Sequence, residues 1–93
     1  MNIYLVSQNK NNGYDTYDSF VCYVETEYEA RVMSPSEHYM WKNDTWNFVY
    51  LDGSYKSSVN RAWCHPNFVE VKLIGNTNEE VDSGVILASF NAG

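Results

Sequence analysis

The sequence predicts an α+β fold: a small single domain with a mostly antiparallel sheet of about five to six strands and one short helix packed on a face. Three observations favour this class. Short runs rich in β-branched and aromatic residues alternate with turn signals, one segment carries helix-capping residues, and an apolar run lies near the end. The 93 residues suit one compact domain, 1–93, without repeats or internal linkers.

The first two strands are expected to form a hairpin. Residues 2–8 open with a nearly continuous apolar run, which we interpret as a strand buried on both faces. Residues 17–25 are rich in β-branched and aromatic side chains, as strands are. Between them lies a polar segment with the turn-forming pair Asn12-Gly13. We therefore expect 2–8 to pair with 17–25.

A change of period predicts one short helix over 26–33. Thr26 fits the N-cap position, and Glu29, three residues later, completes a capping box whose acidic first turn suits the helix dipole. A proline two residues after the segment stops it. A helix this short is marginal alone, so Ala30 and Met33 are expected to pack on the sheet.

The middle of the chain is expected to hold a loop and a second hairpin. Residues 36–47 show no clear period and predict an irregular loop with short strands. Asp52-Gly53 is a strong hairpin turn between the strand 47–51 and the return strand 54–58. The return strand is polar and is expected at a sheet edge. A homodimer through this edge is one option that the sequence leaves open.

Two more strands follow a turn at Pro66. Residues 68–74 alternate as a half-buried strand, whereas the continuous apolar run 85–90 predicts a central strand. No apolar run approaches the roughly 20 residues that a helix needs to cross a bilayer. The N-terminus lacks the basic region of a signal peptide. We therefore expect a cytoplasmic protein without a membrane partner.

Composition narrows the function further. Twelve acidic and six basic residues give a net charge of -6 and a pI near 4.6, which disfavours binding of nucleic acid by charge alone. Aromatic residues make up 16% of the chain, with eight Tyr, three Trp and four Phe. Such ring surface exceeds the needs of a small core and predicts that part of it forms a contact surface.

The residues that could carry chemistry are poorly placed for it. Structural zinc sites draw their ligands in close pairs, but here the one close pair, Cys64-His65, is adjacent, and Cys22 and His38 are distant in sequence. A Cys–His nucleophile pair needs the imidazole near the sulfur, whereas adjacent side chains of an extended segment point apart. With no phosphate loop or hydrolase motif, we expect no enzyme, metal or cofactor. A small enzyme or a zinc protein that uses Cys64 and His65 is kept as an alternative, after the two binding interpretations given below.

An acidic, tyrosine-rich stretch is the strongest binding signal. Between Asn11 and Ala30 the chain has five acidic residues and no basic one, with tyrosines interleaved. Carboxylates that attract a basic partner and tyrosine rings that pack against it are typical of a docking surface, as in a DNA-mimicking inhibitor. The alternative is that this stretch is ordinary solvated surface of an acidic protein. The candidate contact residues are Asp15, Tyr17, Asp18, Glu27, Tyr28 and Trp41.

A second interpretation is a nucleic-acid or nucleotide binding module. Seven aromatic residues lie in the middle of the chain, where Lys42, Lys56 and Arg61 could contact phosphates while rings stack on bases. The small number of cations and the net negative charge weigh against it. Core packing combined with a protein-contact patch accounts for the same residues.

Several segments resemble a family of small uncharacterised proteins of phages and prophages. The resemblance lies in Asn2-Ile3-Tyr4-Leu5-Val6-Ser7-Gln8, in 14–19, in a Trp-x-His-Pro turn at 63–66 and in Gly84-Val85-Ile86-Leu87-Ala88-Ser89-Phe90-Asn91-Ala92-Gly93. It implies an accessory protein of a bacterial host cytoplasm. Many such proteins, anti-CRISPR proteins among them, block a host defence machine without chemistry. We therefore expect a non-enzymatic inhibitor that binds a host protein with a basic surface.

Overall fold

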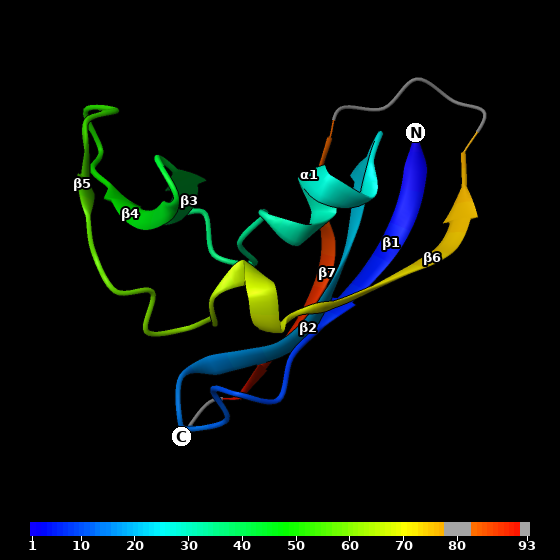
Figure 1. The fold of residues 1–93 in the computed structure, drawn as a ribbon, viewed down its shortest axis with the longest axis horizontal. Helices are drawn as coiled ribbons and strands as arrows, with labels where there is room; N and C mark the ends of the chain where they lie inside the picture. The colour runs from blue at the N-terminus through cyan, green and yellow to red at the C-terminus, as the bar shows by residue number, and fades with distance from the viewer. Residues whose placement is uncertain (78–82, 92–93) are drawn as a thin grey trace.

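The computed structural model describes residues 1–77 and 83–91. These residues form two antiparallel sheets and one short α-helix, which confirms the α+β class (Figure 1). The larger sheet has four strands, in the spatial order β6 (Glu70–Asn76), β1 (Asn2–Ser7), β2 (Thr16–Val24) and β7 (Gly84–Asn91). The smaller sheet has three, in the order β3 (Tyr39–Lys42), β4 (Thr45–Val49) and β5 (Tyr55–Ser57). The helix is α1 (Glu27–Arg31), and a 3-10 turn η1 (Pro66–Phe68) precedes β6.

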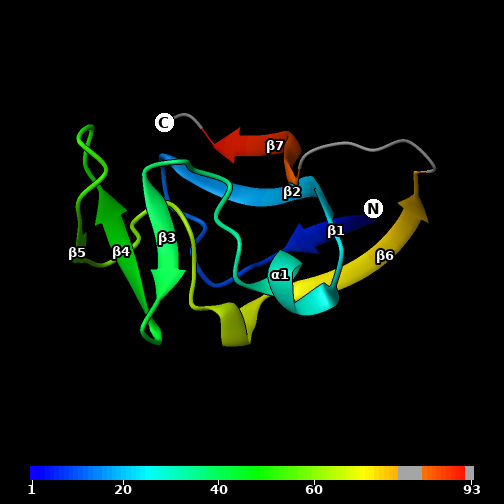
Figure 2. The same cartoon turned by 90° about the horizontal axis from the view of Figure 1, so that it is seen from above.

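The predicted first hairpin is confirmed. β1 and β2 pair antiparallel, from Asn2 opposite Val24 to Ser7 opposite Ser19. Successive side chains of a strand point to opposite faces, so alternate residues of both strands enter the core. Figure 2 shows the hairpin between β6 and β7 in the larger sheet.

The predicted helix is also confirmed, and its cap explains where it begins. The Thr26 hydroxyl accepts a hydrogen bond from the Glu29 backbone N–H at 3.2 Å. Ala30 is fully buried, which docks α1 on the sheet. Arg31 holds the helix from its other end, because its guanidinium donates to the Val69 carbonyl at 3.1 Å.

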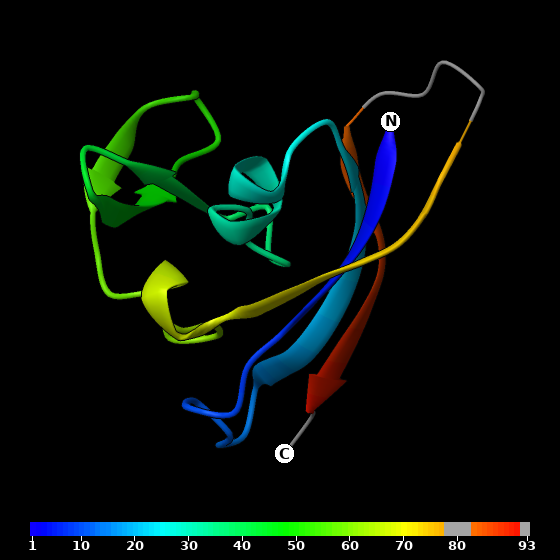
Figure 3. The ribbon, with the colours of Figure 1, turned by 45° about the vertical axis from the view of Figure 1, so that its right-hand side comes forward.

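The core lies on one face of the larger sheet. Phe20 is buried on β2, and its ring lies 5.2 Å from that of Trp63, which belongs to the segment before η1. Figure 3 shows α1 and the smaller sheet on this same side of the larger sheet. The buried apolar residues are Tyr4, Val6, Phe20, Cys22, Val24, Ala30, Trp46, Trp63, Cys64 and Val69.

The prediction that 85–90 forms a central strand is wrong, because β7 lies at an edge of the larger sheet. The hairpin strands take the centre: β1 pairs with β2 and β6, and β2 pairs with β1 and β7. Val85, Ile86 and Leu87 are accordingly exposed. An apolar run therefore marks this strand without defining its position in the sheet.

Residues 36–47 are more regular than the sequence predicts. They hold β3 and the start of β4, which form a hairpin around Asn43 and Asp44, both at φ 58°. Positive φ at both central residues is the type I′ geometry of two-residue hairpin turns. The expected turn at Asp52-Gly53 also forms, with Gly53 at φ 87°, and β5 is an edge strand as predicted. These strands build a separate sheet instead of extending the first.

One face of the larger sheet is not covered by another layer of the described structure. The strand pairs place Ile3 opposite Tyr23, Leu5 opposite Val21, and Val21 opposite Leu87. Because successive side chains of a strand alternate, these residues lie on the face opposite the buried Tyr4, Val6 and Phe20, and we call these five residues the outer face. Figure 3 shows α1 on the other side of the larger sheet. Ile3 and Leu5 are half-buried and Leu87 is 68% exposed. The prediction that the first strand is buried on both faces is therefore wrong, since only its Tyr4 and Val6 side is buried.

Candidate functional site

The six residues predicted for partner binding do not form one patch. Asp15 immediately precedes β2, whereas α1 follows it. The nine residues of β2 span about 30 Å at roughly 3.3 Å per residue, and Figure 1 shows the two ends of this strand at opposite ends of the sheet. One partner that touched both Asp15 and Glu27 would have to extend along the whole larger sheet.

At one end, Glu27 and Tyr28 lie together on exposed α1. Tyr28 is 66% exposed, and Glu29 is the next residue of the helix. Glu27 is not fully available for a partner, because its carboxylate pairs with the Arg31 guanidinium at 3.1 Å. This end of the molecule therefore presents the exposed Tyr28 beside the carboxylates of Glu27 and Glu29, of which Glu27 is already paired with Arg31.

At the other end, Asp15 is exposed with φ 59°. Its neighbour Tyr14, which is not among the six predicted contact residues, is 82% exposed. Asp18 is half-buried where the register between β2 and β7 shifts. Tyr17 is half-buried and packs against the core.

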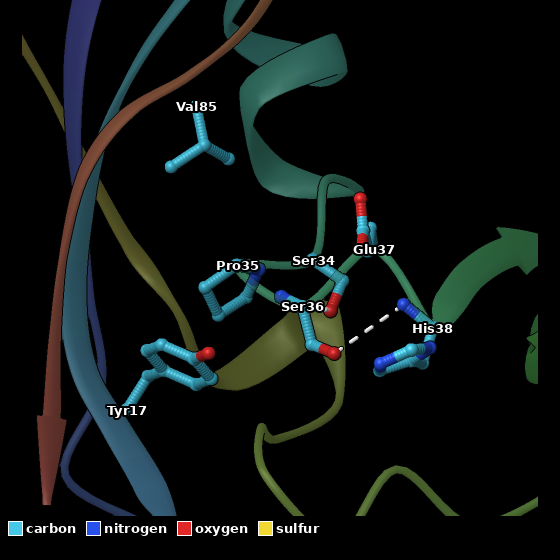
Figure 4. A pocket seen from close by; sticks show the side chains of 7 residues that line it. All are labelled: Tyr17, Ser34, Pro35, Ser36, Glu37, His38 and Val85. Carbon is cyan, nitrogen blue, oxygen red and sulfur yellow. Dashed lines mark hydrogen bonds between the residues drawn. The ribbon is translucent and has the colours of Figure 1, made fainter.

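Tyr17 also lines a pocket of about 490 Å³. Figure 4 shows its ring facing Pro35 and Ser36 across this pocket, with His38 beyond them. A serine beside a histidine could suggest a nucleophile, but the Ser36 hydroxyl accepts from the His38 backbone N–H at 3.3 Å. The His38 imidazole instead stacks on Phe48 at 6.1 Å. The pair lacks the hydroxyl-to-imidazole contact that nucleophilic catalysis requires.

Trp41 belongs to a different part of the molecule from the acidic residues. It is half-buried, and its ring meets Trp46 edge-to-face at 5.3 Å and His65 at 5.0 Å. These three residues, with Trp63 and Cys64, line a cleft of about 620 Å³ between the smaller sheet and the segment before η1. We call it the aromatic cleft, and it gathers all three tryptophans of the chain.

Two buried indoles of the aromatic cleft differ in their hydrogen bonds. The Trp46 indole N–H donates to the Cys64 carbonyl at 2.9 Å. Trp63 is 2% exposed, and within residues 1–77 and 83–91 no acceptor pairs with its indole N–H. A buried polar group left unsatisfied costs about 1–3 kcal/mol. The sequence shows a tryptophan at 63 but not that its N–H is buried without a partner.

The cations of the second interpretation do not line the aromatic cleft, although Lys42 contacts the ring of Tyr55, another of the seven central aromatic residues. The Lys42 ammonium lies 4.8 Å from the centre of the Tyr55 ring. Lys42 pairs with Thr45 and its neighbour Trp41 with Trp46, so the lysine points to the opposite face of the smaller sheet. Lys42, Lys56 and Arg61 are all missing from the described lining of the aromatic cleft.

Both cysteines are buried free thiols. Burial raises the pKa of Cys22, and also that of Cys64, from 9.0 to about 11. The thiolate is the nucleophile and the metal ligand, so neither sulfur is activated near neutral pH. The described residues contain no group of three or more His, Cys, Asp or Glu that could hold a metal ion.

Thiol burial predicts a loss of stability at alkaline pH. Below pH 9.0 both the folded and the unfolded chain keep the thiol protons, whereas between pH 9.0 and about 11 only the folded chain does. The free energy of unfolding should therefore fall by about 1.4 kcal/mol per pH unit for each thiol in this window. Urea unfolding of the wild type and of Cys22→Ala across this range measures it. Equal slopes for the two proteins would contradict the prediction.

The fold and its cleft define a small α+β protein with two antiparallel sheets and an aromatic cleft beside the smaller one. Comparisons with protein-family models, with curated proteins and with solved structures found no match to this chain. In the part of the chain that the structure describes, no helix is long and apolar enough to cross a bilayer.

Proposed function

We propose that this protein is a non-enzymatic binding protein that docks on a partner protein through its outer face. The observation that carries the proposal is this apolar sheet face, which no layer covers within residues 1–77 and 83–91. A sheet normally buries its apolar face against another layer, and contiguous exposed apolar patches mark interaction sites. Leu87, which is 68% exposed at the edge strand β7, is the most accessible residue of the face.

The net charge of -6 supports a partner with a basic surface. Near the outer face, β6 contributes one acid and one base, Glu70 opposite Ser7 and Lys72 opposite Leu5. The ends of β2 are more acidic, with Asp15 before the strand and the α1 carboxylates after it, although α1 lies on the side of the sheet opposite the outer face and its carboxylates act there only at long range. In a chain with net charge -6, such groups attract a basic surface and raise the association rate, whereas the apolar face supplies affinity.

The resemblance of several segments to phage and prophage proteins supports a host protein as the partner. An accessory protein of a phage works among host proteins, and binding alone is enough to block one of them. We therefore propose a bacterial host protein, such as a component of a defence system, as the target and its inhibition as the effect. This choice of partner rests on analogy, whereas the binding surface rests on the geometry of the sheet.

Two exposed leucines allow a matched test. Leu87 belongs to the outer face, and Leu51, which is fully exposed, lies in the turn between β4 and β5. Leu87→Glu is expected to abolish capture of the partner, whereas Leu51→Glu should leave it unchanged. Tagged wild type and both variants would be recovered from a bacterial host that carries defence systems, at low and at moderate salt. Co-purifying proteins would then be identified and their stoichiometry measured.

The outcomes separate the alternatives. A protein bound stoichiometrically by the wild type and by Leu51→Glu, but not by Leu87→Glu, supports the proposal, and its weakening with salt supports the steering role of the acids. Equal capture by both variants overturns the outer face as the site. Loss of a dimer by Leu87→Glu, measured by light scattering, would instead show that a second copy covers this face. Recovery of nucleic acid would favour the second interpretation.

A further inference from the structure

The loop between β1 and β2 carries the pair Asn12-Gly13, for which the proposed docking has no role. Asn12 is the one asparagine of the chain that a glycine follows, and asparagine is a chemically labile residue. Both residues are exposed, and Figure 1 shows their loop at the end of the larger sheet away from α1. In such a pair the glycine backbone nitrogen can attack the asparagine side-chain carbonyl carbon, because glycine has no Cβ to hinder the approach.

The folded loop leaves the attacking nitrogen free. Among the residues that the structure describes, none accepts a hydrogen bond from the Gly13 backbone N–H. A Cβ added at Gly13 would meet no atom within 4 Å, so the space around this nitrogen is open. The Asn12 side chain donates through Nδ2 to the Asn9 carbonyl at 2.7 Å. That bond engages the amide nitrogen and not Cγ, which is the carbon under attack.

A second pair of the same kind, Asp52-Gly53, has the opposite arrangement. The Gly53 backbone N–H donates to the Tyr50 carbonyl at 3.0 Å, which holds its proton. The Asp52 Oδ1 accepts from the Ser54 backbone N–H at 2.9 Å and from the Ser54 hydroxyl at 2.6 Å. The Ser54 hydroxyl, and then its backbone N–H, lower the pKa of Asp52, and an ionised carboxylate is a poor electrophile. The chain therefore holds one open pair and one protected pair.

We propose that Asn12 is a site of spontaneous deamidation, in which water converts its carboxamide to a carboxylate through a cyclic imide. Hydroxide from the solvent removes the Gly13 N–H proton, and the nitrogen lone pair forms a bond to Asn12 Cγ. The bond from Cγ to the side-chain nitrogen breaks, and this nitrogen leaves as ammonia with a proton from water. Water then opens the imide without any oxidation or reduction. Cleavage at Cγ gives aspartate, whereas cleavage at the backbone carbonyl carbon gives isoaspartate.

This reaction changes both the charge and the backbone of the loop. Thirteen acidic groups against six basic ones bring the net charge from -6 to -7, close in sequence to the exposed Asp15. Isoaspartate also lengthens the main chain between Asn11 and Gly13, because the chain then runs through the side-chain carbon. The Asn11 side chain donates to the Trp63 carbonyl at 3.2 Å. A longer loop should therefore weaken the contact between the first hairpin and the segment before η1.

Peptide mapping of aged protein tests the proposal. Purified wild type is incubated for weeks at neutral pH and physiological temperature, digested, and analysed by mass spectrometry with fragmentation that distinguishes isoaspartate from aspartate. We expect the Asn12 peptide to gain the mass of an amide-to-acid conversion with first-order kinetics, and to contain more isoaspartate than aspartate. The rate should rise at mildly alkaline pH, because hydroxide removes the Gly13 proton. Release of ammonia measures the same reaction independently.

Two controls separate the effect of the folded loop from that of the dipeptide. Gly13→Ala has room for its methyl group, so it should keep the fold while slowing deamidation several-fold, since the methyl group hinders ring closure. Incubation in guanidinium chloride gives the rate of the unfolded chain. We expect the folded rate at Asn12 to lie within a few-fold of it, whereas isoaspartate at Asp52 should form only in the unfolded chain. Leu87→Glu should leave the rate unchanged, so the failure of one proposal does not affect the other.

Three results would overturn the proposal. The first is an Asn12 that stays intact in the folded protein but deamidates in the unfolded chain, because the loop would then protect it. The second is formation of aspartate without isoaspartate, which indicates direct hydrolysis in place of the imide. The third is an equal rate for the wild type and Gly13→Ala, because the Gly13 nitrogen would then not be the nucleophile.

Discussion

Phe20→Ala is expected to lower the free energy of unfolding by about 3–5 kcal/mol, the usual cost of truncating a buried aromatic side chain. Phe20 is 1% exposed on the central strand β2, and its ring packs on Trp63 at 5.2 Å. It thus joins the larger sheet to the segment that leads to η1. Small domains are stable by only about 5–15 kcal/mol, so this variant should be partly unfolded at room temperature.

Urea unfolding followed by tryptophan fluorescence measures this effect. Leu51→Ala is the control, because Leu51 is fully exposed and its truncation should change stability by less than about 0.5 kcal/mol. Where Phe20→Ala is too unstable for a full transition, Phe20→Leu should give a smaller loss that can be measured. A loss below about 1 kcal/mol for Phe20→Ala would show that the ring is not packed as described.

Gln8→Ala is expected to lower the free energy of unfolding by about 2–6 kcal/mol, since its buried side chain makes four hydrogen bonds of about 0.5–1.5 kcal/mol each. The amide Oε1 accepts from the backbone N–H groups of Lys10 and Asn11, both at 2.8 Å. The Nε2 group donates to the carbonyls of Asn11 and Tyr17, also at 2.8 Å. Gln8 therefore holds the loop of the first hairpin against β2.

Gln8→Glu separates the two halves of this contact. It keeps an acceptor for the Lys10 and Asn11 N–H groups but places a carboxylate beside two carbonyls. We expect faster hydrogen exchange at the Lys10 and Asn11 amides in Gln8→Ala than in Gln8→Glu, and lower stability than wild type for both. Unchanged exchange in Gln8→Ala would show that the loop does not depend on this side chain.

The same loop links the hairpin to the aromatic cleft. The Asn11 side-chain amide donates to the carbonyls of Arg61 at 2.9 Å and Trp63 at 3.2 Å. The backbone of Trp63 is thus held by a loop that is about 50 residues away in sequence. Because these are contacts between distant segments, loss of Gln8 should also disturb the cleft, which the Trp63 indole resonance would report.

The candidate site could be predicted only in part. Asp15, Glu27 and Tyr28 are exposed, as predicted for contact residues, whereas Tyr17 and Asp18 are half-buried. Their separation along β2 could not be predicted, because residues close in sequence lie at opposite ends of an extended strand. Trp41 was predicted to contact the same partner as the acidic residues, but its ring packs against Trp46 in the aromatic cleft. The outer face was missed because an apolar strand residue predicts burial, not which layer covers it.

The sequence by itself determined the elements whose causes are local. The first hairpin, the Thr26 cap of α1 and the Asp52-Gly53 turn depend on residues a few positions apart, and all three form as predicted. Tertiary structure alone decided that β7 is an edge strand and that β3, β4 and β5 form a separate sheet. It also decided that the Trp63 N–H lacks a partner in the described structure. The order of strands in a sheet, and whether a buried side-chain N–H finds an acceptor, depend on which distant segments meet. No local pattern in the chain encodes that choice.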